Sequence, residues 1–177
     1  NADGAVGRID NVRIAPESAP IELYGNALAD GWYLWDCCGA ATFAEVDDDD
    51  EHGKVIELSF LEGSTVTGLQ ATAAMDASSA MGGSLQFDFK EVSPPPDGSQ
   101  WRVKLESSGA ATFAEAVLTD GGNPAPNSDW QSYTFGFDSE LPGLDLMNLS
   151  LVLFFPDWGN AQGAVARIDN IRLVPTQ

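Results

Sequence analysis

The chain alternates strictly between polar and apolar residues over the stretch Ser84-Leu85-Gln86-Phe87-Asp88-Phe89-Lys90. Successive side chains of a β-strand point to opposite faces of a sheet, so every second residue here would enter a core. The same period of two recurs on both sides of this stretch, in Ile56, Leu58 and Phe60, in Trp101, Val103 and Leu105, and in Tyr133, Phe135 and Phe137. This pattern predicts an all-β protein.

Turn-forming residues separate these stretches at 47–53, 93–99, 120–129 and 156–163. Short strands with this regular punctuation predict an antiparallel β-sandwich of the jelly-roll type. The stretch Leu149–Phe155 is apolar on both faces, as expected of a central strand. The sequence GAATFAE occurs at Gly39–Glu45 and again at Gly109–Glu115, which predicts two similar strands. Only Ala71–Ala80 is a candidate for a turn or two of helix.

A longer repeat indicates the domain organisation. The stretch Gly4–Pro16 (GAVGRIDNVRIAP) reappears almost unchanged as Gly163–Pro175 (GAVARIDNIRLVP). We therefore expect residues 1–16 to be the last strand of a preceding tandem module, 17–20 to be a linker, and 21–177 to be the module itself. With no initiator Met, the chain is expected to be a piece of a larger multimodular protein.

Composition limits the possible partners. The 177 residues include 27 acidic and 8 basic side chains, for a formal net charge of −19. Nucleic acids and anionic membranes are bound through clustered Lys and Arg, so we expect neither as a partner, and a neutral ligand suits the chain better than a sulfated one. No apolar run approaches the ~18–20 residues of a membrane span. The acidity by itself is also typical of a protein that stays soluble in a salty extracellular medium.

The two cysteines, Cys37 and Cys38, are adjacent. They cannot link distant segments. Either they close a vicinal disulfide in an oxidising compartment, or they are two free thiols.

Several motifs together resemble a known family. The closing stretch Arg167–Leu173 (RIDNIRL) is similar to the last strand of many jelly-roll carbohydrate-binding modules. An ordered series of motifs resembles, over nearly the whole module, the galactose-binding-like modules appended to marine bacterial β-glucanases and laminarinases: Leu23-Tyr24, Gly31-Trp32, Leu34-Trp35-Asp36, Gly53-Lys54-Val55-Ile56, Gly68-Leu69-Gln70, Leu85-Gln86-Phe87-Asp88 and Phe155-Pro156-Asp157-Trp158-Gly159. The resemblance implies a secreted, extracellular bacterial module without catalytic activity, which binds a polysaccharide, foremost a β-glucan such as laminarin, for a polysaccharide-degrading parent enzyme.

The same resemblance implies a structural calcium ion. Its ligands would be Asp169 of the closing strand and main-chain oxygens near Lys54 and the first strand. The acidic run 47–50, with Asp48, offers a second set of the hard oxygens that calcium prefers, although its spacing is not that of an EF-hand. Alternatively, Asp169 only accepts hydrogen bonds from a turn.

Catalysis is the main rival function. Glu45–Glu51 matches the E-x-D-x-x-x-E spacing of retaining laminarinases, which need two carboxylates ~5–5.5 Å apart. Here Asp residues replace the apolar strand residues between them, so the segment reads as a loop and we expect no activity. His52 is the one histidine, without partners for zinc, and is expected in a solvated loop. If the chain were a small jelly-roll lyase or hydrolase, only Arg102 and Asp88 would be available as catalytic residues. A structural or adhesion spacer is a third possibility.

Aromatic and polar residues supply candidates for sugar binding, because sugar rings stack on aromatic rings while their hydroxyls bind polar groups. Of the five tryptophans, Trp35 and Trp158 are our stacking candidates, and we expect Trp101 and Trp130 in the core. The polar candidates face away from the core on two predicted strands, where they could equally form a solvated face: Gln86 and Asp88 on one, Arg102 and Lys104 on the other.

Overall fold

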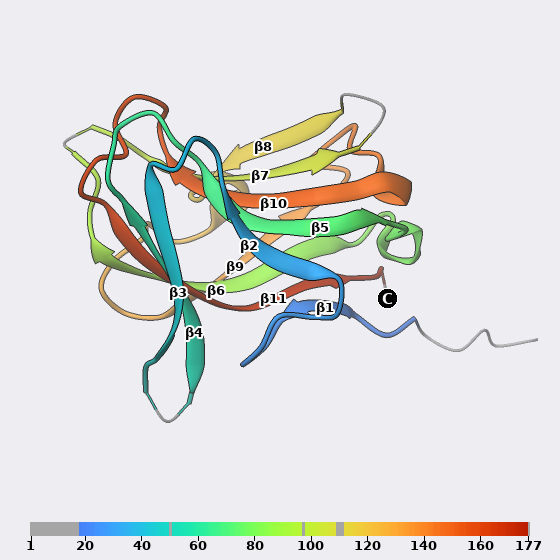
Figure 1. Ribbon diagram of the computed structural model, residues 1–177. Coiled ribbons are helices and arrows are strands. Elements are labelled where there is room, and N and C mark those ends of the chain that lie inside the picture. The colour runs from blue at the N-terminus through green and yellow to red at the C-terminus, as the bar shows by residue number, and fades with distance from the viewer. Residues whose placement is uncertain (1–17, 50, 97, 109–111, 177) are drawn as a thin grey trace, which may run out of the picture.

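The computed structural model describes residues 18–49, 51–96, 98–108 and 112–176. The expected strand from a preceding module, residues 1–16, lies outside them. The described residues form two antiparallel sheets packed face to face (Figure 1). The eleven strands are β1 (Ile21–Tyr24), β2 (Trp32–Asp36), β3 (Ala41–Asp47), β4 (Lys54–Phe60), β5 (Thr67–Met75), β6 (Ser84–Ser93), β7 (Trp101–Ser107), β8 (Phe113–Val117), β9 (Gln131–Gly136), β10 (Leu149–Pro156) and β11 (Val165–Val174).

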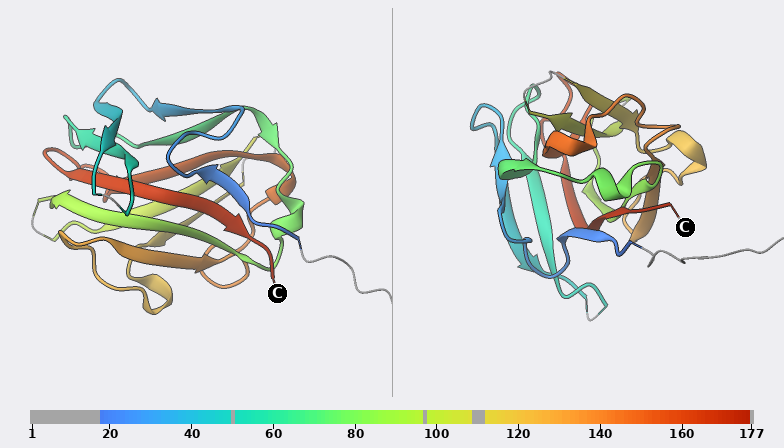
Figure 2. Two further views of the ribbon diagram at one scale, coloured as in Figure 1. Left: turned by 90° about the horizontal axis from the view of Figure 1, so that it is seen from below. Right: turned by 90° about the vertical axis from the view of Figure 1, so that its right-hand side faces the viewer.

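One sheet, called sheet A here, has the order β3-β4-β11-β6-β9, with β1 added beside β11. The other, sheet B, has the order β2-β5-β10-β7-β8. Strands that follow each other in the chain often lie in different sheets, as β6 and β7 do, so the chain crosses repeatedly between the two layers (Figure 2). This confirms the predicted all-β sandwich with a jelly-roll arrangement.

The alternating stretches form the core between the sheets. Leu85, Phe87 and Phe89 of β6 are all buried, while the residues between them face out from sheet A. Phe87 lies at the centre of the core, with its ring 4.9 Å from that of Phe154 and 5.5 Å from that of Tyr133. The alternation predicted at 56–60, 101–105 and 133–137 is buried in the same way. Leu149–Phe155 lies in β10, the middle strand of sheet B, as expected.

Strand β11 has two different partners along one side. Its first half pairs with β4, through Val165 to Ile168, and its second half pairs with β1, where Leu173 lies opposite Ile21. Its other side pairs with β6 over most of its length, and that register shifts between Asp169 and Arg172. The closing strand is thus irregular at the point where β4 gives way to β1.

The single helical turn expected within Ala71–Ala80 is present as the 3₁₀ turn η1 at Ser78–Ala80, although β5 continues to Met75 before it. One local prediction was wrong. Glu45–Asp47, expected in a loop, is the end of strand β3. The GAATFAE copies do contribute two similar strands, β3 and β8, each at the edge of its sheet. Two further 3₁₀ turns lie at Asp120–Gly122 (η2) and Leu146–Asn148 (η3), and no helix within the described ranges has the length and hydropathy to cross a membrane.

Candidate functional site

A groove lies on the outer face of sheet B, near the end of β10. It has a volume of about 570 Å³ and is lined by Val66, Arg102, Lys104, Glu115, Phe155, Asp157 and Trp158. The register of the strands places these residues: Val152 and Leu105 lie opposite each other and face the core, so the next pair, Leu153 and Lys104, lies on the other side of the sheet, where Leu153 is covered and Lys104 is half-buried. The groove therefore lies on the surface of the sheet and does not enter the core.

The turn after β10 holds Trp158 in this groove. Asp157 ties the turn to β7, because its backbone N–H donates to Gln100 O at 2.8 Å and its carboxylate accepts from Gln100 N at 3.0 Å. The turn is also close to another loop, since Gly159 N–H donates to Gly63 O at 3.0 Å. The indole of Trp158 itself is 60% exposed. A large aromatic ring held in the open by a fixed turn suits stacking against a ligand better than packing.

The cations of the groove are paired with carboxylates. Arg102 binds Asp157 through Nε at 2.5 Å and Glu115 through Nη1 at 3.0 Å. Lys104 binds Glu106 at 2.6 Å and lies 4.5 Å from the ring centre of Phe113. Burial raises the pKa of Asp157, but the hydrogen bonds from Arg102 and Gln100 outweigh it and hold that pKa below its ordinary value. The hydrogen bond to Asp157 likewise raises the pKa of Arg102.

Trp35 lies on the same outer face as the groove. It pairs with Gly68 of β5, which in turn lies opposite Leu153 of β10. The Trp35 ring is half-buried. Of the six predicted binding residues, the structure thus brings three, Trp158, Arg102 and Lys104, into one groove. It places a further one, Trp35, on the same face of the sheet.

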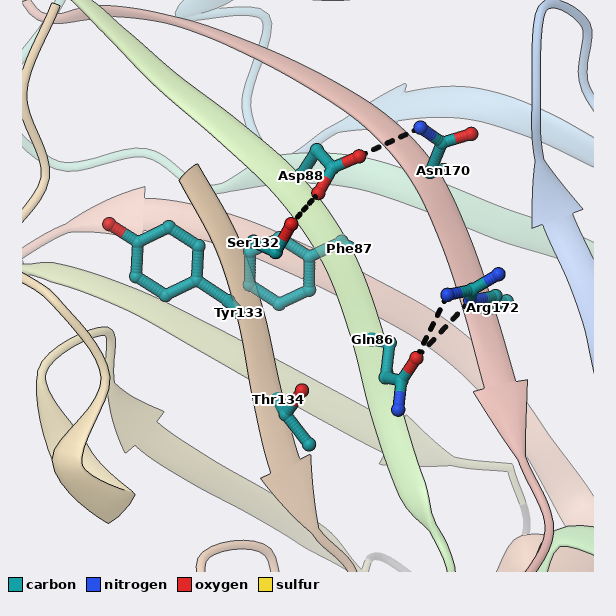
Figure 3. Close-up of a pocket in the computed structure, with 8 residues that line it drawn as sticks. All are labelled: Gln86, Phe87, Asp88, Ser132, Tyr133, Thr134, Asn170 and Arg172. Atoms are coloured by element: carbon teal, nitrogen blue, oxygen red, sulfur yellow. Dashed lines mark hydrogen bonds between the residues drawn. The ribbon is translucent and has the colours of Figure 1, made fainter. Parts of the chain in front are cut away.

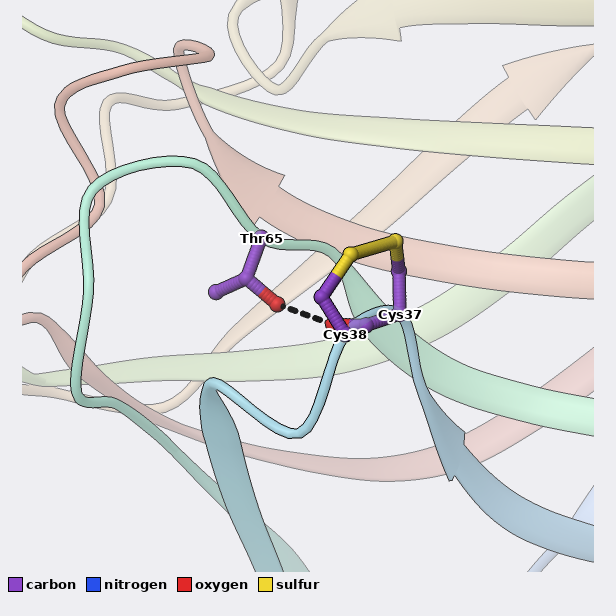
Figure 4. The surroundings of a disulfide bond; sticks show 3 residues. All are labelled: Cys37, Cys38 and Thr65. Atoms are coloured by element: carbon purple, nitrogen blue, oxygen red, sulfur yellow. Dashed lines mark hydrogen bonds between the residues drawn. A yellow bond between two sulfur atoms is a disulfide. The ribbon is translucent and has the colours of Figure 1, made fainter.

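The two cysteines form a disulfide directly after β2 (Figure 4). Cys37 N–H donates to Val66 O at 2.9 Å, and Thr65 Oγ1 donates to Cys37 O at 2.8 Å. Cys38 has a φ of +78°, so the backbone reverses sharply there. Because Val66 lines the groove, the disulfide ring lies at its edge.

Gln86 and Asp88 do not belong to this groove. They face outward from β6 in sheet A, and Arg102 and Lys104 face outward from sheet B, so the two pairs lie on opposite surfaces of the sandwich. Gln86 and Asp88 instead line a polar pocket with residues of β9 and β11 (Figure 3). The same separation shows that Arg102 and Asp88, the residues considered for a lyase or hydrolase, do not form one site.

In the acidic turn between β3 and β4, the surroundings of His52 differ from those expected. His52 is 8% exposed and not a solvated loop residue; its Nδ1 lies 3.0 Å from Asp49 Oδ1. Its ring stacks on Trp130 at 4.1 Å between centres. Trp130, expected in the core, is therefore a half-buried residue of the outer face of sheet A, whereas Trp101 is buried in the core as predicted.

The predicted calcium ligands have different surroundings. Asp48 is held between Lys90 Nζ and Arg167 Nη1, each 3.2 Å from one of its oxygens, so its charge is already compensated. The described part of the chain contains no group of three or more His, Cys, Asp or Glu side chains arranged to hold a metal. Asp48 is thus already paired with two cations of the protein, Lys90 and Arg167.

Asp169 fits a hard cation better. It is 2% exposed, and its Oδ1 is buried without a hydrogen-bond partner. Burial raises the pKa of Asp169, whereas the backbone N–H groups of Asn170 and Asn26 lower it. Oxygens of Asn26 and Lys54 lie at the same junction, where Asn26 Oδ1 accepts from Lys54 N and Lys54 O accepts from the Tyr24 hydroxyl. This set of oxygens, drawn from the junction of β1, β4 and β11, suits calcium.

Sequence reasoning missed several groove residues. Asp157 directly precedes the candidate Trp158 in a Pro-Asp-Trp-Gly turn, so its role in fixing that turn could have been suspected. Glu115 belongs to the second GAATFAE copy, whose side chains could not be assigned to a face without knowing its sheet. Val66 gave no signal beyond being apolar, and Phe155 was part of the motif Phe155–Gly159 without being singled out as a binding residue.

Comparisons with known proteins agree with the fold. No protein-family model and no curated protein matches the chain. A family 11 carbohydrate-binding module from Clostridium thermocellum, solved in complex with a β-1,3-1,4-mixed-linked tetrasaccharide, is 17% identical at a TM-score of 0.56, over 90% of this chain and 98% of that one. The family 30 carbohydrate-binding module of cellulosomal cellulase Cel9D-Cel44B of Clostridium thermocellum is 11% identical at a TM-score of 0.64, over 90% of this chain and 99% of that one.

A complete enzyme also contains this fold. The exo-1,3/1,4-β-glucanase ExoP from a Pseudoalteromonas species is 11% identical at a TM-score of 0.60, and the match covers 99% of this chain but only 23% of the enzyme. From Ile21 onward, the chain therefore has the β-jelly-roll fold seen in family 11 and family 30 carbohydrate-binding modules.

Proposed function

We propose that this chain is a non-catalytic carbohydrate-binding module that binds a neutral β-glucan, such as laminarin or a mixed-linkage glucan, in the groove on sheet B. The observation that carries the proposal is the exposed indole of Trp158, fixed by its turn beside the polar side chains of Arg102 and Lys104. The ring would stack on the apolar face of a sugar, and the polar groups would bind its hydroxyls.

The charges of the groove support a neutral ligand. Arg102 and Lys104 are already bound to three carboxylates, those of Asp157, Glu115 and Glu106. An anionic polysaccharide would have to displace these carboxylates or accept their repulsion. Sugar hydroxyls can instead donate to the carboxylates and accept from the cations, which adds charge-assisted hydrogen bonds without breaking the pairs.

The structural neighbours support the β-glucan class. One is a module bound to a mixed-linked tetrasaccharide, and another is an exo-1,3/1,4-β-glucanase of which this fold is a part. In this proposal the module is secreted, works in the extracellular space, and holds a parent polysaccharide-degrading enzyme at its glycan.

A structural calcium ion at Asp169 is part of the proposal. The buried carboxylate, with one oxygen lacking a protein partner, and the oxygens of Asn26 and Lys54 would hold it. The ion would supply charge compensation and join β1, β4 and β11; it lies away from the groove and would not contact the sugar.

Affinity electrophoresis tests the proposal directly. The protein should be retarded in gels that contain laminarin or mixed-linkage glucan, and not in alginate gels; agarose and xylan complete the panel. Trp158→Ala should fold normally and lose about 1–3 kcal/mol of binding free energy, by analogy with aromatic stacking on other planar ligands. Trp35→Ala should be tested beside it, alone and in the double variant.

Met81→Ala is the matched control, because Met81 is 64% exposed and lies in the turn before β6, outside the groove. It should bind as the wild type does. Full retention of binding by the Trp35/Trp158 double variant would move the site elsewhere, and failure to bind any glycan would favour a spacer or adhesion module.

A further inference from the structure

The outer face of sheet A, opposite the glycan groove, holds two adjoining hollows. The first, shown in Figure 3, has a volume of about 240 Å³ and lies over β6, β9 and β11. The second has about 190 Å³ and is lined by Glu51, His52 and Trp130 among others. Both are lined by Asp88 and Ser132, so they adjoin.

An irregularity in β11 creates the first hollow. Asp169 lies opposite Asp88 and Arg172 lies opposite Gln86, so β11 has one residue more than β6 between these two pairs. Asn170 takes up the difference with a φ of +52°. Such bulges redirect side chains, and here Asn170 turns toward Asp88 while Asp169 stays buried.

The side chains of this hollow hold each other in place. Asp88 accepts hydrogen bonds from Asn170 Nδ2 at 2.7 Å and from Ser132 Oγ at 2.6 Å. Arg172 donates to Gln86 Oε1 from Nε at 3.3 Å and from Nη2 at 3.1 Å (Figure 3). Planar polar groups that are oriented before a ligand arrives lose little conformational entropy when it binds.

The charges of this hollow are not paired with each other. Arg102 and Arg167 each bind carboxylates, yet Arg172 has no carboxylate partner within the described residues and binds only the neutral Gln86. Asp88 accepts hydrogen bonds from two neutral groups, the Asn170 amide and the Ser132 hydroxyl. His52 Nε2 lies 3.9 Å from its carboxylate, beyond hydrogen-bond distance. The hollow thus offers one cation and one anion, each able to make further charge-assisted hydrogen bonds.

This chemistry matches a small polyhydroxylated ligand. A guanidinium and a carboxylate with no net charge between them favour neither a free anion nor a free cation. They do suit neighbouring hydroxyls, which can donate to Asp88 and accept from Arg172. Typical ligand pockets have about 300–1,000 Å³, so hollows of about 240 and 190 Å³ accommodate only one or two sugar residues.

We propose that the outer face of sheet A carries a second sugar site, which takes one or two residues of a neutral sugar and acts independently of the groove on sheet B. Asp88, Asn170 and Arg172 bind the hydroxyls, and the edge of Trp130 borders the second residue. The two sites face in opposite directions, so one module can contact two glycan chains.

NMR titration of the ¹⁵N-labelled protein with glucose, galactose, cellobiose and laminaribiose tests this. We expect saturable shifts of the Asn170 side-chain amide, the Arg172 Nε–H and the Ser132 and Thr134 amides at millimolar sugar. Arg172→Ala should weaken this response at least tenfold and leave polysaccharide retardation unchanged. Trp158→Ala should do the reverse, so failure of one site is distinguishable from failure of the other.

Asn170→Gly serves as a second variant, because Gly tolerates the positive φ and removes only the amide. It too should weaken the response. The inference is overturned if none of the four sugars shifts these signals, if the shifts survive in Arg172→Ala, or if glucuronate or inorganic phosphate shifts them and the neutral sugars do not.

Discussion

Arg102 donates a hydrogen bond from Nε to Asp157 Oδ1 across 55 residues of sequence, and this pair links strand β7 to the turn that carries Trp158. The carboxylate also accepts from Gln100 N, so it is held on two sides. The position of the exposed Trp158 ring in the proposed glycan site therefore depends on an ionised Asp157.

The first prediction concerns pH. The pKa of Asp157 lies below its ordinary value of 3.8 because of its hydrogen bonds, so its contribution to folding is complete above 3.8 and is lost as the pH falls through the lower, folded-state value. Asp157→Asn should cost about 1 kcal/mol of unfolding free energy at pH 7 and weaken glucan binding. Below the folded-state pKa the variant and the wild type should converge, as denaturant unfolding across the acidic range would reveal.

Asp129→Asn is the control for this prediction, because Asp129 is exposed and forms no ion pair with a described residue. It should unfold as the wild type does at every pH. If the unfolding free energies of Asp157→Asn and the wild type differ by the same amount down to pH 2, the ionised Asp157 carboxylate is not the source of that stability.

The second prediction concerns calcium. An ion that binds only the folded state stabilises it by about 2.7 kcal/mol at 100 times its dissociation constant. EDTA should lower the melting temperature, and added calcium should restore it. Asp169→Ala should abolish the response, and Asp129→Ala should keep it. An unmoved transition, with no metal found by elemental analysis, would remove calcium from the proposal.

The third prediction is the absence of catalysis. The hydrolase-like spacing does not give a rigid pair, because Glu45 lies on β3 while Glu51 follows in a turn. Incubation with laminarin, mixed-linkage glucan, agarose or alginate should release no reducing ends and no unsaturated products. Reproducible turnover that disappears in Glu45→Ala or Asp88→Ala would show that the protein is an enzyme.

The fourth prediction concerns Gly68, which lies between Trp35 and Leu153 on sheet B. A Cβ at this position would come 2.1 Å from the backbone oxygen of Val152, so the strands would have to separate. Gly68→Ala should destabilise the fold by about 1–3 kcal/mol in urea unfolding. Gly25→Ala is the control, because its new methyl would meet only the flexible Glu22 side chain. If the two variants are equally stable, the close approach of Gly68 to the Val152 backbone is refuted.

The fifth prediction concerns residues 1–16, which lie outside the described ranges. Their sequence could occupy the place of β11, but that strand already has β6 on one side and β4 and β1 on the other. Deleting them should leave stability and glycan binding nearly unchanged and abolish any weak, concentration-dependent dimer seen by light scattering. A large loss of stability would place the module boundary before Ile21.

Period-two alternation was sufficient to predict the strands around Phe87 and Val103, because each has one face in the core. It could not show that β6 and β7 lie in different sheets, and Asp88 and Arg102 were therefore considered together. The Ala-rich β5 resembles a helix by propensity, but pairing with β2 and β10 overrides this. The stack of Trp130 on His52 joins segments far apart in sequence, which no local pattern reveals.

The pairing of Ile21 with Leu173 brings the start of β1 and the end of β11 together, at the opposite end of β11 from the Trp158 turn. A polypeptide spliced in between two halves of a host protein needs its ends close together and its working surface elsewhere. Residues 21–175 meet both conditions for the groove on sheet B (Figure 1). They should therefore tolerate insertion into an exposed loop of an unrelated enzyme, and not only fusion at its termini, without obstructing that groove.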